Sequence, residues 1–74
     1  MRSLRKRFGK KLFDLRHHAN LTQEQLAQNA EISVDFLSLM ERGVNAPSFE
    51  TLEKLSLAMG LPVKEFFNFD SDLS

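Results

Sequence analysis

The side chains with the most versatile chemistry in this sequence are two adjacent histidines, His17 and His18. Imidazoles serve as general bases or metal ligands when acids or further histidines converge on them. Neighbouring residues on a helix project about 100° apart, and no group of acids and histidines accompanies this pair. We therefore expect no metal site and interpret both histidines as solvated residues at a helix end.

Groupings typical of catalysis are missing as well. The sequence has no cysteine, no grouping of Ser, His and Asp, and no glycine-rich loop suited to cradling phosphates. We expect that the protein is not an enzyme, uses no cofactor and takes no small-molecule ligand. The absence of cysteine also excludes disulfides and thiolate metal sites, and it is compatible with a reducing cytoplasm.

The stretch SVDFLSLM, residues 33–40, offers the chemistry of recognition. At helical spacing Phe36, Leu37 and Met40 are expected to face the core. The side chains left at the surface are Val34, Asp35, Ser38 and Leu39. They supply a carboxylate, a hydroxyl and two aliphatic groups, without any cation or amide.

Charge is distributed unevenly although the net charge is zero. Residues 1–16 contain seven basic side chains and one acid, for a charge of +6, and residues 17–74 contain three basic side chains and nine acids, for a charge of −6. Such a split predicts a basic patch on a neutral molecule. The alternative is a solvated, amphipathic helix start.

Length and hydropathy favour one small soluble domain. The 74 residues lie near the lower limit at which a chain buries enough apolar surface to fold without staples. No apolar run approaches the roughly 20 residues of a membrane span, and no signal peptide is recognisable. We therefore expect a cytoplasmic protein with no membrane partner.

Helical spacing of apolar residues extends over almost the whole chain, without alternation typical of strands. Phe8, Leu12 and Leu15 predict a first helix over about residues 4–18 that Asn20 ends. Thr22, followed three residues later by a glutamine, is a capping-box signature for the second helix.

Ser33 is expected to cap a third helix, which Gly43 ends. Ser48 then caps a fourth helix, whose inward face includes Phe49, and Gly60 closes it. Pro62 suits the first turn of a short fifth helix. The fold class is thus all-α, a compact domain of five helices.

Three regions follow from this reading. Residues 1–7 form a basic N-terminal arm or helix start, residues 8–67 form the folded domain, and residues 68–74 form an acidic tail that is expected to fray.

Within residues 23–42, Ala27 lets two helices cross closely, and Leu26, Ile32 and Leu37 fill the angle between them, as in a helix-turn-helix. The chain resembles the phage-repressor and Cro-like family of DNA-binding domains, also called the xenobiotic-response-element type. The motifs that carry the resemblance, over about residues 8–67, are LRHHANLTQEQLA, ERG at 41–43, APSFETLEKL and AMGLPVKEFF. It implies a lambda-repressor-like fold and a transcriptional regulator whose recognition helix, about residues 33–41, enters the major groove of double-stranded DNA.

The resemblance also implies roles for individual residues. In the family, the glutamine that opens the second helix, here Gln23, contacts a DNA phosphate, and residues Arg16 and Glu41 form a structural ion pair. Further phosphate contacts are expected from helix N-termini, the loop after the recognition helix and the basic first helix: Thr22, Ser33, Arg42, Asn45, Ser48, Lys10 and Lys11. Members usually bind near-palindromic operators as homodimers.

Some positions depart from the family pattern. Glu31 stands at a turn position that is usually glycine, so either it adopts a positive φ at a cost of about 1–2 kcal/mol or the turn is shifted. Val34 and Leu39 stand where the family commonly has polar or basic residues. Base reading by hydrogen bonds is reduced accordingly.

The remaining side chains still have ways to read DNA. Asp35 can accept a hydrogen bond from cytosine N4, Ser38 can donate or accept, and Val34 or Leu39 can pack on a thymine methyl group. Affinity must then come from the basic N-terminus and the helix N-termini, so that binding depends strongly on salt.

The aromatic C-terminal segment predicts a dimer interface, which we assign to Val63, Phe66, Phe67 and Phe69. The alternative is that Phe66 only closes the core. The short chain resembles restriction-modification controller proteins and phage regulators of the Cro kind. A different class also remains open, a protein-interaction module that keeps the repressor-like fold and binds a protein through Phe13, Val34 and Leu39.

Overall fold

The structure, a computed structural model, describes residues 2–69 and contains only helices in that range. The four α-helices are α1 (Leu4–His18), α2 (Gln23–Ala30), α3 (Val34–Glu41) and α4 (Phe49–Met59), and a 3-10 helix, η1 (Val63–Phe67), follows. The all-α class is therefore confirmed. The expectation of five α-helices is not confirmed, because the fifth element is a 3-10 helix. Pro62 is the N-cap of this element and does not lie in its first turn.

Each α-helix begins at a residue whose side chain can satisfy a free backbone N–H group. The hydroxyl oxygens of Ser3, Thr22, Ser33 and Ser48 accept from the backbone N–H three residues later. Thr22 and Gln25 bond reciprocally, which makes the predicted capping box. Three of the four caps were predicted from the sequence, and the cap at Ser3 was missed.

Each of the four connections between helices contains a residue in the left-handed backbone conformation. Glu31, at the C-cap of α2, has φ 58°, and Gly60, at the C-cap of α4, has φ 66°. Asn20, in the turn after α1, also has a positive φ of 59°. Of the two alternatives for Glu31, the structure therefore has the positive φ and not the shifted turn.

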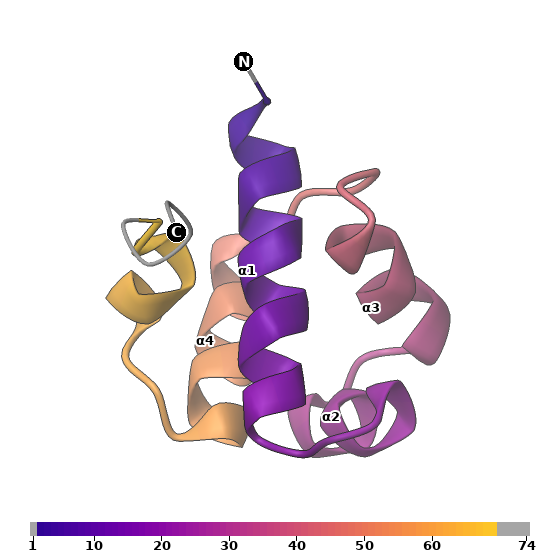
Figure 1. The fold of residues 1–74 in the computed structure, drawn as a ribbon. Helices are drawn as coiled ribbons and strands as arrows, with labels where there is room; N and C mark the ends of the chain where they lie inside the picture. The colour runs from indigo at the N-terminus through magenta and orange to yellow at the C-terminus, as the bar shows by residue number, and fades with distance from the viewer. Residues whose placement is uncertain (1, 70–74) are drawn as a thin grey trace.

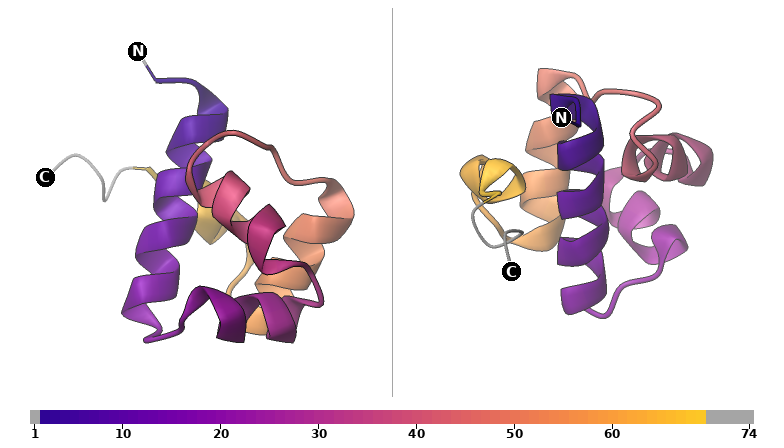
Figure 2. Two further views of the ribbon diagram at one scale, coloured as in Figure 1. Left: turned by 90° about the vertical axis from the view of Figure 1, so that its right-hand side faces the viewer. Right: turned by 45° about the horizontal axis from the view of Figure 1, so that its top comes forward.

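Helix α1 packs against α3 and η1, and α2 packs against α3 and α4. In Figure 1, α1 runs vertically at the front, with α3 on its right and α4 and η1 on its left. The left view of Figure 2 shows α1 at one edge of the molecule and α4 at the other. The closest approach is at Gly9, where an added Cβ would lie only 2.8 Å from the carbonyl oxygen of Glu41 and would also collide with that of Met40. The absence of a side chain at Gly9 thus lets α1 cross directly over the end of α3.

The core draws on every helix. Its buried apolar side chains are Phe8, Leu12, Leu26, Ala27, Ala30, Leu37, Met40, Leu52, Leu55 and Phe66. One expectation about the core was wrong. Phe36 is half-buried and packs against the core, as expected, but Phe49 is 85% exposed because it lies at the first position of α4, outside the packed part of that helix.

The two ends of the chain differ in structure. Residues 4–7 of the basic N-terminal segment belong to α1. Asn68 and Phe69 follow η1 without helical structure, and the rest of the acidic tail lies outside the described residues. No helix in residues 2–69 has the length and apolar character needed to cross a membrane.

Candidate nucleic-acid interface

Helices α2 and α3 meet at the turn around Glu31 and share one side of the molecule, which the left view of Figure 2 faces. On α3, Asp35 is exposed, and Ser38 and Leu39 are half-buried. Val34 is also half-buried, but it packs against the core. The surface that α3 offers therefore rests mainly on Asp35, Ser38 and Leu39, with a smaller contribution from Val34 than the sequence suggested.

The N-termini of α2 and α3 carry hydroxyl groups that remain able to donate. The Thr22 hydroxyl accepts from the Gln25 N–H at 3.1 Å, and the Ser33 hydroxyl accepts from the Phe36 N–H at 3.0 Å. Each hydroxyl uses an oxygen lone pair in its cap and keeps its own proton for an external acceptor. Backbone N–H groups at a helix N-terminus favour anions, so both positions suit a phosphate oxygen.

The carboxylate of Glu41 links three helices. Arg16 of α1 donates from Nε to Glu41 Oε2 at 2.6 Å and from Nη2 to Oε1 at 3.0 Å. Gln23 of α2 donates from Nε2 to the same Oε1 at 3.0 Å. The side chains of Arg16 and Glu41 are only 8% and 4% exposed, so the expected ion pair is present and buried.

The bond from Gln23 to Glu41 was not expected. From the sequence we assigned Gln23 to a phosphate contact only, because side chains eighteen positions apart in the chain give no local signal of meeting. Gln23 remains half-exposed, and its amide has a second N–H. The structure therefore places it both in the junction of the helices and at the N-terminus of α2.

The loop after α3 is held close to that helix. The Val44 N–H and the Asn45 N–H both donate to the Leu39 carbonyl oxygen, at 2.9 Å and 3.3 Å. Arg42 and Ser48 are exposed and Asn45 is half-buried, so all three lie at the surface in or beside this loop. The Ser48 hydroxyl caps α4 and also bonds to the hydroxyl of Thr51 at 3.0 Å.

The two lysines assigned to phosphate contacts in α1 differ. Lys10 is exposed, and its Nζ lies 3.2 Å from Asp14 Oδ2 one turn further along the helix. Lys11 is only 7% exposed. Its assignment to a phosphate contact is therefore wrong, because its helix face turns into the protein; charge counting along the sequence does not distinguish the two.

The C-terminal aromatic residues have different environments. Phe66 is fully buried, with its ring 6.2 Å from that of Phe8, so its assignment to a dimer interface is wrong and the alternative that it closes the core holds. Val63 and Phe67 are 37% and 36% exposed. Phe69 is half-buried, and the guanidinium of Arg7 lies 4.4 Å above its ring.

Two apolar side chains of α4 are more exposed than these. Phe49 and Leu57 on α4 are 85% and 83% exposed. Helical periodicity indicates that Leu57 is exposed, because Leu57 lies off the face of α4 that Leu52 and Leu55 define.

The histidines of α1 take local partners. His18 Nδ1 lies 2.9 Å from the carbonyl oxygen of Asp14, and the His17 ring lies 4.2 Å from the ring of Phe13. Within residues 2–69, no cluster of His, Asp and Glu side chains has the arrangement of a metal site.

Comparison with known proteins gives a consistent result. The model of a helix-turn-helix family matches residues 12–66. Control protein C.BamHI of Bacillus amyloliquefaciens is 32% identical over 68 residues, which cover 90% of this chain and 84% of that protein. The cryptic phage CTXphi transcriptional repressor RstR of Vibrio cholerae is 34% identical over 58 residues, 78% of this chain and 52% of the repressor. The chain thus spans most of one relative and about half of the other.

Among solved structures, the restriction-modification controller protein C.AhdI from Aeromonas hydrophila matches with a TM-score of 0.82 and 31% sequence identity. The alignment covers 84% of this chain and 94% of that one. The order and packing of the helices described above are therefore shared with a protein of similar size.

Proposed function

Because the chain belongs to the helix-turn-helix family of transcriptional regulators, we propose that it binds double-stranded DNA as a homodimer on a near-palindromic operator. Helix α3 lies in the major groove in this proposal. The observation that carries it is the arrangement of Asp35, Ser38 and Leu39 on one face of α3, beside the capped N-termini of α2 and α3. Proteins of this family are regulators and not enzymes, in agreement with the absence of catalytic groupings in the sequence.

Base reading rests on few groups. Asp35 accepts a hydrogen bond from cytosine N4, Ser38 donates to or accepts from a base edge, and Leu39 packs on a thymine methyl group. Val34 contributes only the part of its side chain that the core leaves uncovered. The absence of cations on this face means that sequence preference and affinity come from different parts of the molecule.

Affinity comes from groups that surround this face. The Thr22 and Ser33 hydroxyls and the second N–H of Gln23 donate to phosphate oxygens at the helix N-termini. The further phosphate contacts are made by Arg42, Asn45, Ser48 and Lys10. Each phosphate neutralised by a cation releases counterions, so the affinity falls steeply as salt rises.

The dimer forms through the C-terminal part of the molecule. Val63 and Phe67 supply exposed apolar area there, and Phe69 packs beside Phe67 with ring centroids 6.3 Å apart. Leu57 of α4 is a further exposed apolar side chain. Two copies that pair through this surface place two α3 helices for two half-sites, whose spacing follows from the symmetry of the pair.

The controller class is supported by two similar proteins. The relative C.BamHI is a control protein and the neighbour C.AhdI is a restriction-modification controller, and both are matched over most of their lengths. We propose that this chain is a cytoplasmic regulator of the same kind, which acts through its own concentration. The phage regulator remains the other candidate within the family, since RstR is a repressor.

Selection of binding sites from randomised duplex DNA tests the proposal directly. We expect a site with two-fold symmetry, and fluorescence anisotropy with that site should show an affinity that falls by orders of magnitude between low and physiological salt. Absence of binding to any duplex at low salt would overturn the proposal. It would favour the protein-interaction module instead, for which the exposed Phe13 and the half-exposed Leu39 are the available apolar groups.

A further inference from the structure

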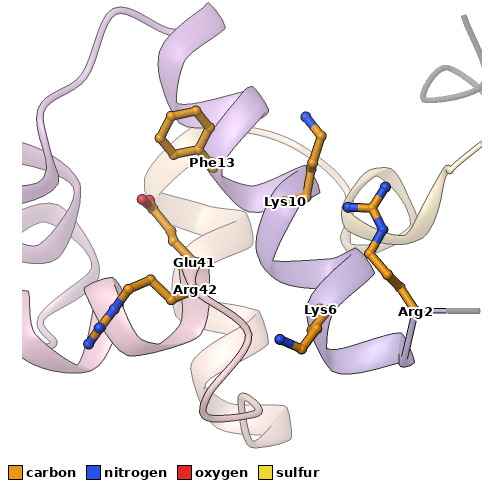
Figure 3. A pocket seen from close by; sticks show the side chains of 6 residues that line it. All are labelled: Arg2, Lys6, Lys10, Phe13, Glu41 and Arg42. Atoms are coloured by element: carbon orange, nitrogen blue, oxygen red, sulfur yellow. The ribbon is translucent and has the colours of Figure 1, made fainter.

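A basic pocket lies between the N-terminal half of α1 and the end of α3, next to the proposed DNA-reading face. Its volume is about 400 Å³. The residues that line it are Arg2, Lys6, Lys10, Phe13, Glu41 and Arg42 (Figure 3). Four of these six side chains are cations. Two of them, Arg2 and Lys6, belong to the basic N-terminus but are not among the individual phosphate contacts named above.

Two of the cations share one side of α1. Lys6 and Lys10 are four residues apart on this helix, which places them on the same side and about 6 Å apart along the axis. Arg2 lies just before the helix, ahead of its N-cap Ser3, and lines the same pocket. Arg42, at the C-cap of α3, adds a fourth cation from across the pocket. In Figure 3 the amino group of Lys6 points towards the end of α3, and the guanidinium of Arg42 extends away from α1.

The loop after α3 holds Lys6 in this position. Gly43 has φ 76°, and an added Cβ there would lie 2.7 Å from Lys6 Cγ and 2.9 Å from Lys6 Cα. The backbone of Gly43 is thus packed against the aliphatic part of Lys6. A lysine whose stem is packed presents its ammonium group with less loss of side-chain entropy than a freely rotating one.

The acids near the pocket do little to oppose an anion. The Glu41 carboxylate receives two hydrogen bonds from Arg16 and one from Gln23, so its charge is already balanced by a buried guanidinium. Asp14 pairs with Lys10 at 3.2 Å, but the Lys10 side chain is 51% exposed. Exposed pairs of this kind are weak and readily exchange for another anion.

We propose that this pocket binds consecutive phosphate groups of the DNA backbone, beyond those held by the N-termini of α2 and α3. Several cations around one pocket fit a polyanion with regularly spaced charges better than they fit one small anion. The pocket lies at the end of α3 opposite to Ser33, so it engages a part of the backbone that the capped helix N-termini do not reach. This inference rests on the proposed function and assigns Arg2 and Lys6 to DNA binding.

The test compares two double variants that each lose two exposed cations. R2Q/K6Q removes charge from the pocket, and K54Q/K64Q removes the same charge elsewhere, on α4 and η1. Binding to the duplex selected from randomised DNA is measured by anisotropy over a series of salt concentrations. Ethylation interference on the same duplex then maps the phosphates that matter, and thermal melting confirms that both variants fold.

For R2Q/K6Q we expect affinity to fall by about 10- to 100-fold and the slope of log Kobs against log salt to flatten by about 2 for each bound subunit. The interference map should lose one cluster of phosphates and keep the rest, and preference for the selected site over a mismatched one should stay unchanged. K54Q/K64Q should keep the whole map.

Two results would overturn the inference while the proposed function stands. One is that the two variants bind the selected duplex equally well, with identical interference maps. The other is that the pocket binds a free phosphate compound instead of DNA. In that case inorganic pyrophosphate, titrated at constant ionic strength, would shift the NMR resonances of Lys6 and Arg42 at micromolar concentration, and R2Q/K6Q would keep the complete interference map. Failure of the unmodified protein to bind any duplex would instead remove the proposed function and this inference with it.

Discussion

Asp35 is the single side chain on which sequence preference should depend most. It is exposed at the start of α3 and accepts hydrogen bonds only, which suits cytosine N4 and repels phosphates. We expect Asp35→Ala to lower discrimination between the selected site and a mismatch at one position by about 1–3 kcal/mol. Overall affinity should change little or increase, because a repulsive charge is lost.

Competition binding with a panel of single-base mismatches measures this effect. Glu53→Ala serves as the control, since it removes an exposed carboxylate from α4, outside the proposed reading face. If Asp35→Ala abolishes binding altogether or leaves every mismatch penalty unchanged, Asp35 does not read a base.

Glu31 stores backbone strain in the turn between α2 and α3. Its φ of 58° costs a residue with a Cβ about 1–2 kcal/mol. Glu31→Gly should therefore raise the free energy of unfolding by up to about 1 kcal/mol, since the added freedom of the unfolded chain offsets part of the gain.

Urea denaturation of Glu31→Gly and Glu31→Ala separates strain from charge. Both variants lose the carboxylate, but only glycine loses the Cβ. Equal stability of the two variants would show that the backbone conformation at Glu31 is not the source of the effect.

At this scale the sequence predicted the residues whose structure is decided locally. The caps at Thr22 and Ser33 and the glycine C-cap at Gly60 follow from the chemistry of a few neighbouring residues. The burial of Lys11 could not be predicted, because it depends on how α1 is rotated against the rest of the fold. The contact of Val34 with the core depends on the same kind of tertiary packing.

Among the elements, α1, α2 and α3 meet at one ion pair. Removal of one partner leaves the other charge buried, which typically costs about 3–5 kcal/mol. Glu41→Ala should therefore destabilise the fold by about this amount, as measured by chemical denaturation. The double variant R16M/E41L removes both charges and should recover at least half of the loss. Equal destabilisation by the single and double variants would show that the charges are not the cause.

The crossing of α1 over α3 depends on Gly9. A methyl group at Gly9 would meet the carbonyl oxygens of Met40 and Glu41, which belong to backbone and cannot rotate away. We expect Gly9→Ala to destabilise the protein by about 2–4 kcal/mol, although alanine favours helix elsewhere.

Gly60→Ala provides the matched control for this substitution. At Gly60 nothing lies within 4 Å of an added Cβ, and only the positive φ of 66° opposes alanine. Its cost should be about 1 kcal/mol. Thermal melting that finds Gly9→Ala as stable as Gly60→Ala or more stable would contradict the close crossing.

Helix positions were predicted well because apolar spacing and caps agree along the chain. The ends were predicted less well. The exposure of Phe49 was missed because a periodic pattern does not show where packing against neighbours stops. The 3-10 geometry of η1 was missed because a five-residue segment carries too few residues to distinguish helix types.

For the molecule as a whole, the prediction concerns self-association. Val63→Glu places a charge in the apolar surface assigned to the dimer and should shift the protein towards monomer at micromolar concentration. Sedimentation equilibrium measures the change. Val44→Glu, in the loop after α3, introduces the same charge at another exposed valine and should leave the dimer intact. A monomeric unmodified protein would contradict the proposed dimer.

The surfaces of the whole molecule were the hardest to predict from sequence. The charge split along the chain indicated a basic patch, but only the fold brings Arg42 to the pocket that holds Lys6 and Lys10. The aromatic C-terminal segment indicated an interface, yet Phe66 belongs to the core. A sequence pattern shows which residues are polar or apolar. Which of them lie at the surface depends on contacts between segments that are distant in the chain.

The carboxylate of Glu41 also bears on how selective the protein is. Its hydrogen bonds join α1, α2 and α3 and hold the proposed reading face in one arrangement. In the proposed complex, binding would then cost little ordering of the protein, and a mismatched base would meet a preorganised surface. With three side chains proposed to read bases, such preorganisation would help the protein to distinguish its site from similar sequences.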